Sequence, residues 1–72
     1  MANFEILNAL DMLDAYIYDL QKQEDERAAN YIKLNRGNEE VRKERTTQRD
    51  SYNAALYQIT CKLCEMRRKA RA

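Results

Sequence analysis

The segment Arg36-Gly37-Asn38-Glu39-Glu40 lies between two apolar repeats that have the same spacing. Gly37 suits the left-handed backbone position just past a helix end, and Asn38 suits the N-cap of a following helix. Glu39 and Glu40 then occupy a first helical turn, where acidic side chains complement the helix dipole. The segment therefore predicts a turn at about residues 36–38 that joins two helices.

Both flanks of this turn carry apolar residues at alternating spacings of four and three, the pattern of a helix with one apolar seam. The seam residues are Ile6, Leu10, Leu13, Ile17 and Leu20 before the turn, and Tyr52, Leu56, Ile59, Leu63 and Met66 after it. The repeats predict helices at about residues 3–35 and 39–70. One glycine and no proline among 72 residues also argue against a turn-rich β fold.

One unbroken helix in a parallel coiled coil is the alternative to this hairpin. Carrying the first spacing through residue 37 places polar residues at half of the next ten seam positions, among them Asn38, Arg45 and Lys62. A glycine inside a helix also costs about 1 kcal/mol. The second half fits its own register far better, so the sequence favours the hairpin.

Folding the chain back at the turn brings the two seams level. Leu10 then meets Leu63, and Ile17 meets Leu56. Each seam also has a polar interruption at the same distance from the turn, and these comprise Glu24 and Arg27 before it and Thr46 and Arg49 after it. The predicted fold is all-α: an antiparallel, coiled-coil-like two-helix hairpin in a single domain of residues 1–72.

The charged residues are segregated along the chain, although the net charge is only +1. Residues 1–26 hold seven acids and one base, which gives −6, whereas residues 27–72 hold twelve bases and five acids, which gives +7. Such asymmetry marks either a nucleic-acid-binding half or two halves that lie against each other. In the hairpin, acids such as Glu5 and Asp11 lie along the basic carboxyl-terminal end, which favours the second interpretation.

A chain this short seldom buries enough apolar surface to be stable alone. Further apolar residues outside the seams lie near the chain termini, and we expect them to pack against a second copy or a partner protein. With a second copy, the product is a homodimeric four-helix bundle. The residues expected at this partner or dimer interface are Leu7, Met12, Tyr16, Tyr18, Tyr57, Cys61 and Cys64.

The sequence contains no pattern that predicts catalysis, a cofactor or a metal site. No histidine is present, so the commonest general base is missing. Cys61 and Cys64 alone cannot supply the four ligands of a structural zinc site, although two copies meeting at a symmetry axis offer four thiolates. We expect half-buried thiols and no enzymatic activity.

The basic residues give an alternative function, which is nucleic-acid binding. Bases gather near the turn and in the carboxyl-terminal tail, and acids interleaved with the turn-end bases weaken this interpretation. The candidate contacts are Arg42, Lys43, Arg45, Arg49, Arg67, Arg68, Lys69 and Arg71.

The leading hypothesis is a small protein-interaction module, either an adaptor or an inhibitor of a larger protein. Accessory proteins of mobile elements are a class that such a chain fits. The longest apolar run, Ala15-Tyr16-Ile17-Tyr18, is far shorter than the roughly 20 residues of a membrane-spanning helix. The amino-terminal residues do not resemble a signal peptide, and two cysteines are too few for a disulfide scaffold. We therefore expect a cytoplasmic location.

Overall fold

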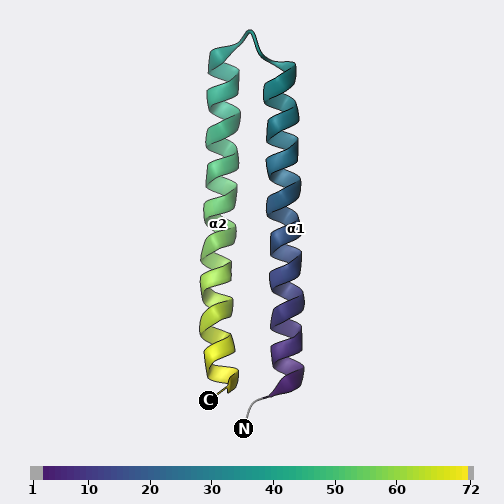
Figure 1. Cartoon of the computed structure of the whole chain (residues 1–72). Coiled ribbons are helices and arrows are strands. Elements are labelled where there is room, and N and C mark those ends of the chain that lie inside the picture. The colour runs from purple at the N-terminus through teal and green to yellow at the C-terminus, as the bar shows by residue number, and fades with distance from the viewer. Residues whose placement is uncertain (1–2, 72) are drawn as a thin grey trace.

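Two long antiparallel helices make up the structure, a computed structural model that describes residues 3–71 (Figure 1). Helix α1 spans Phe4–Leu34 and helix α2 spans Glu39–Arg71, and residues 3–71 contain no strand. The prediction of an all-α chain with two helices is confirmed. The helices end within a residue of the positions expected from the sequence.

Asparagine side chains cap the start of both helices. Oδ1 of Asn38 accepts a hydrogen bond from the Val41 amide at 3.1 Å, as its predicted N-cap role requires. Oδ1 of Asn3 accepts one from the Ile6 amide at the same distance. The Asn3 amide also donates to the carbonyl of Ala70 at 3.1 Å, so this backbone bond joins the two helices at the end opposite the turn.

The end of α1 is closed differently from the sequence prediction. No residue in the described range 3–71 has a positive φ, so the expected left-handed conformation of Gly37 is wrong. Instead, the Asn35 amide donates to the carbonyls of Tyr31 and Ile32, and the Asn35 side chain donates to the Tyr31 carbonyl at 2.8 Å. Because Asn35 satisfies these helix-end carbonyls, no left-handed glycine is needed.

Replacing Gly37 with alanine is therefore expected to stabilise the protein. A Cβ at this position meets no atom within 4 Å, and the backbone is not left-handed. The gain, about 0.4–1 kcal/mol, comes from the reduced conformational entropy of the unfolded chain. Urea denaturation followed by circular dichroism measures it. Asn38→Ala is the matched control, because losing the cap costs about 1 kcal/mol; a similar loss for Gly37→Ala would contradict the prediction.

The buried core between the helices is small. It consists of one row of apolar side chains, which are Leu10, Ile17, Ala28, Leu56 and Leu63. Polar residues alternate with this row at half-buried positions, and these are Asp14, Gln21, Asn53, Thr60 and Arg67. The contact between the helices is thus half polar.

The predicted seams are therefore only half correct. Four of the ten seam residues are buried, whereas Leu20 is half-buried and the other five remain substantially exposed, namely Ile6, Leu13, Tyr52, Ile59 and Met66. The physical reason is geometric. A helix that touches one neighbour buries only a narrow strip, and the apolar stripe of each helix here is wider than that strip and turned to one side of it.

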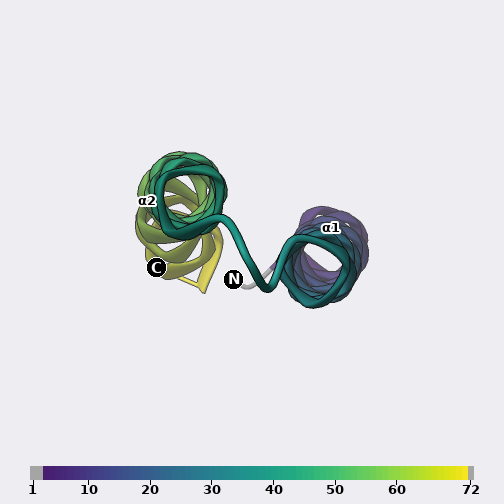
Figure 2. The same cartoon turned by 90° about the horizontal axis from the view of Figure 1, so that it is seen from above.

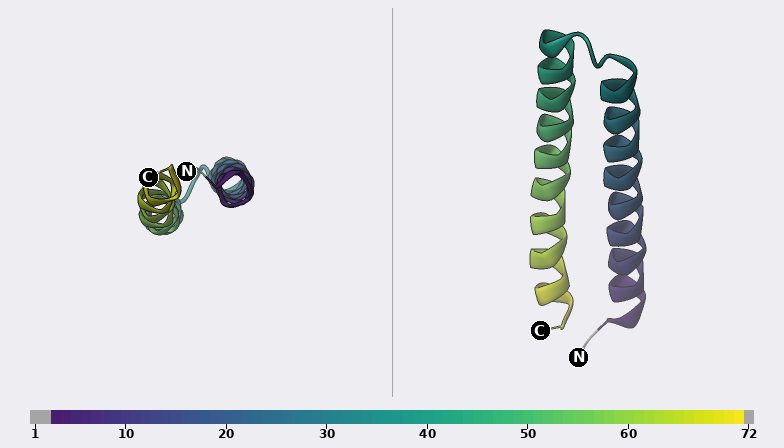
Figure 3. Two further views of the ribbon diagram at one scale, coloured as in Figure 1. Left: turned by 90° about the horizontal axis from the view of Figure 1, so that it is seen from below. Right: turned by 45° about the horizontal axis from the view of Figure 1, so that its top comes forward.

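The hairpin is a single layer of two helices. The end-on views show the helices side by side, and the start of α1 and the end of α2 lie together opposite the turn (Figures 2 and 3). The Cα atoms extend over 57 × 15 × 7 Å with a radius of gyration of 16.6 Å. A compact domain of this length has a radius of gyration of about 11 Å. In residues 3–71, neither helix has an apolar stretch of the length and purity that crossing a bilayer demands.

Candidate interaction surface

The exposed seam residues of both helices gather on one face of the hairpin. Tyr31 follows Leu13 by about five full helical turns, and Val41 precedes Ile59 by the same number, so each pair lies on one side of its helix. Tyr31 and Val41 line a common surface hollow together with Arg45 and Gln48. The sides of α1 and α2 that carry these residues therefore converge on the same face.

We call this surface the apolar face, and it extends from the chain termini to the turn. Its members are Ile6, Leu13, Leu20 and Tyr31 of α1 and Val41, Tyr52, Ile59 and Met66 of α2. Six of the eight are 38–49% exposed, while Leu20 and Val41 are half-buried. Each of these side chains is partly covered by the neighbouring helix, and the rest of its surface is open to solvent.

The opposite face of the hairpin is polar and joined by cross-helix contacts. Arg67 donates from Nη2 to the Asp11 carboxylate at 2.9 Å and also to the Asp14 carboxylate. Hydrogen bonding to Asp14 raises the pKa of the Arg67 guanidinium and so favours its charged form. Nearer the turn, the side-chain amide of Asn53 donates to Asp25 at 3.1 Å. The expected attraction between the acidic first helix and the basic carboxyl-terminal end is thus made through Arg67.

A buried ion pair occupies the polar interruption of the seam. Glu24 is 9% exposed, and its Oε1 lies 2.5 Å from Nη1 of Arg45. Hydrogen bonding to Glu24 raises the pKa of the Arg45 guanidinium above its ordinary value. Polar residues do face each other here, but the sequence placed Thr46 and Arg49 opposite this level. The shift follows from the rotated seam, because Arg45 lies nearer the apolar face than Arg49 does.

The structure does not bring together the seven residues expected at a partner or dimer interface. Tyr18, Tyr57 and Cys64 lie towards the polar face, as does the half-buried Leu7. Met12 points away from α2, and Tyr16 alone borders the apolar face. These positions follow from the same rotation of the seam, which places the set on several sides of the hairpin.

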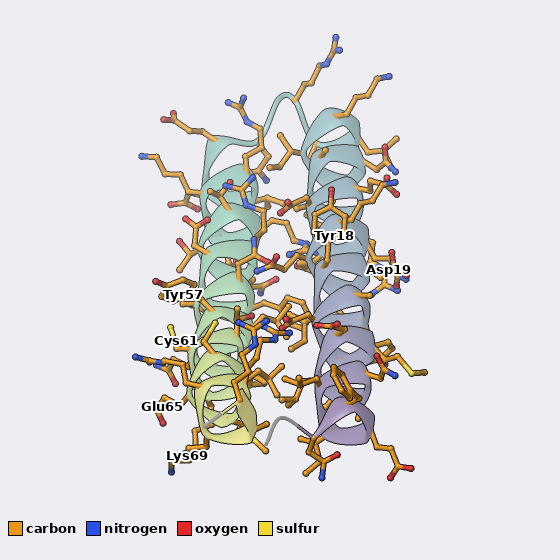
Figure 4. All side chains as sticks on the ribbon, turned by 60° about the horizontal axis from the view of Figure 1, so that its bottom comes forward. Tyr18, Asp19, Tyr57, Cys61, Glu65 and Lys69 are labelled. Atoms are coloured by element: carbon orange, nitrogen blue, oxygen red, sulfur yellow. The ribbon has the colours of Figure 1, made fainter. Side chains whose placement is uncertain are left out.

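The outer side of α2 carries Cys61, which Figure 4 shows with Tyr57, Glu65 and Lys69 on the side of the helix away from α1. Interaction with the Cys61 thiol, one helical turn away, raises the pKa of the Tyr57 hydroxyl. Both cysteines are free and exposed, rather than half-buried as expected.

The four candidate nucleic-acid contacts near the turn are mostly engaged within the chain. Arg45 pairs with Glu24, and Lys43 and Arg49 each pair with an acid of α2. Arg42 is half-buried, and its Nε is buried without a hydrogen-bond partner in the described structure. Three of these four bases are therefore paired with acids of the same chain.

Of the four candidate contacts in the carboxyl-terminal tail, one is paired with acids of the chain and three are not, within the part of the chain that the structure describes. Arg67 is held by Asp11 and Asp14 on the polar face. Within residues 3–71, Arg68, Lys69 and Arg71 form no ion pair with an acid. Since they surround the last two turns of α2 and lie far from the turn, the eight bases do not form one basic surface.

Residues 3–71 offer little sign of a metal site or an enclosed pocket. Within residues 3–71, no three histidine, cysteine, aspartate or glutamate side chains gather to hold a metal ion. The surface hollows are open to solvent, such as the one on α1 lined by Tyr18, Gln21, Lys22 and Asp25. The apolar face is therefore the feature that distinguishes one side of this molecule from the other.

Neither a protein-family model, nor a curated protein, nor a solved structure matches the chain. The assignment of function consequently depends on the geometry of the hairpin.

Proposed function

We propose that the protein is a non-enzymatic protein-interaction module that works as a homodimer, in which the apolar face of one copy binds the same face of the other. The proposed biological role is that of an adaptor or an inhibitor of a larger protein. Catalysis is not part of the proposal, since the sequence has no histidine to act as general base.

The observation that carries the proposal is the half-exposed apolar face beside an opposite face that is polar. Contiguous exposed apolar surface of this kind marks interaction sites in proteins. Its members combine aliphatic side chains with Tyr31, Tyr52 and Met66, and aromatic residues and methionine are enriched at protein interfaces. The polar face, by contrast, already satisfies many of its charges within the chain.

The amount of exposed surface also supports an interface. The accessible surface is 5827 Å². A compact monomeric protein of this mass exposes about 4,700 Å², so the excess is about 1,100 Å². A standard protein interface covers about 800 Å² of each partner. Covering the apolar face with a second copy over this standard area would remove most of the excess.

Sedimentation equilibrium tests the proposed homodimer. The chain has a mass of 8.6 kDa, and the expected mass in solution is twice that value, or about 17 kDa. A folded chain that remains at 8.6 kDa up to concentrations of about 100 μM would contradict the homodimer.

A further inference from the structure

We infer that the apolar face is covered by a second copy whose turn lies at the same end, with the two-fold axis parallel to the helices. Each α1 then has two neighbours, which are its own α2 and the α2 of the other copy. This arrangement rests on the proposed function, and it specifies what occupies the face and in which orientation.

The direction of the apolar stripe identifies a four-helix bundle rather than a flat contact with one further helix. In α1 the stripe of Ile6, Leu10, Leu13, Ile17 and Leu20 is centred roughly 45° around the helix from the direction of α2, at about 100° per residue. In a square array of four helices, the bundle axis lies about 45° from the direction of each neighbour. The apolar stripe of α2 is displaced by a similar angle from the direction of α1, towards the same face of the hairpin. Both stripes therefore converge on one axis outside the hairpin.

The distribution of residues along the face decides between the two ways of pairing it. The half nearest the termini is apolar, with Leu13 level with Ile59 and Leu20 level with Tyr52, whereas Arg27 and Gln48 occupy the level beyond these towards the turn. When the two turns lie at the same end, the apolar residues of one copy face the apolar residues of the other. When they lie at opposite ends, Leu13 meets Arg27 of the other copy, which leaves a charge against an apolar side chain.

Charge complementarity favours the same arrangement. Glu5 and Lys69 lie on the outer sides of their helices (Lys69 in Figure 4), at nearly the same level, because the backbone bond between Asn3 and Ala70 brings these two helix ends level. With the turns together, α1 packs beside the α2 of the other copy, so Glu5 lies beside the partner's Lys69. Each acidic amino-terminal half then lies between two basic carboxyl-terminal halves, and opposite charges across an interface select one orientation.

A distance measurement between the two turns tests this arrangement. Arg36 is exposed in the turn, and a spin label on Arg36→Cys in a Cys61→Ser, Cys64→Ser background reports the separation by dipolar spectroscopy. Neighbouring helices pack 8–10 Å apart, so turns at the same end place the labels within about 30 Å. The hairpin is 57 Å long, and turns at opposite ends therefore place them about 50 Å or more apart. The matched control is Asp19→Cys, at the middle of α1 on its outer side (Figure 4), where both arrangements give less than about 40 Å.

Each result of this experiment is decisive. A short distance for both labels supports the inferred arrangement. A long distance at Arg36 with a short one at Asp19 overturns the arrangement while leaving the homodimer intact. A sample that sediments as a monomer and shows no dipolar coupling overturns both the arrangement and the proposed homodimer.

Discussion

Leu10→Ala is expected to destabilise the protein by about 2–5 kcal/mol, the usual cost of removing a leucine from a well-packed core. Leu10 is 2% exposed and packs in the cluster with Ile17, Leu56 and Leu63. Few apolar side chains are buried between these helices, so the remaining contacts compensate little. We expect the helical signal to be largely lost at 37 °C, because natural proteins of this size have only a few kcal/mol of stability.

Urea denaturation followed by circular dichroism measures this loss. All variants are compared at one protein concentration, because the stability of a dimer depends on concentration. Met12→Ala is the matched control: Met12 is 74% exposed on the same helix, and its truncation is expected to change stability by less than about 0.5 kcal/mol. Equal losses for the two variants would show that Leu10 is not part of the core.

Ile59→Glu is expected to weaken the proposed homodimer by at least about 100-fold, which corresponds to about 2.7 kcal/mol. Ile59 is about half exposed in the single hairpin, so a carboxylate there remains hydrated in the monomer. In the proposed dimer the same carboxylate would be enclosed among apolar side chains, where an unpaired charge is strongly unfavourable. The variant should therefore affect association far more than the contact between α1 and α2.

Sedimentation equilibrium gives the dissociation constant, and circular dichroism at the same concentration reports the folded fraction. The control Gln58→Glu introduces the same charge one residue away, at an exposed position outside the apolar face, and should leave association unchanged. Ile59→Val retains an apolar side chain and should also leave the dimer intact. Unaltered dimerisation of the Ile59→Glu variant would show that this face is not the interface.

The sequence was sufficient to predict the helices and their order because local signals determine them. The asparagine cap at residue 38 and the two acids after it define the start of α2. Residues at equal distances from the turn face each other, and this places Glu24 opposite a basic stretch of α2, where Arg45 contacts it. The closure of α1 was not predictable in the same way, because Asn35 and a left-handed glycine are equivalent solutions to one hydrogen-bonding problem.

The orientation of each helix about its own axis was not predictable from the apolar repeat. The repeat shows the mean direction of all the apolar side chains of a helix, and this mean includes side chains that lie outside the contact within the hairpin. Leu13 and Ile59 therefore look like seam residues although they flank the contact within the hairpin. Polar residues at Asp14 and Asn53, which take the half-buried seam positions, are the signal that distinguishes the two directions.

The pair formed by Glu24 and Arg45 has a consequence for how two copies align along their length. It lies in the seam towards the apolar face, so a second copy encloses it further. In the inferred arrangement the polar level of one copy meets the polar level of the other. Sliding one copy by a heptad moves these charges against leucine and isoleucine, which is costly, as with single polar residues that set the register of coiled coils. The ion pair thus fixes the position of one copy relative to the other along the helix axes. We therefore expect a single narrow distribution of distances between the spin labels at the two turns.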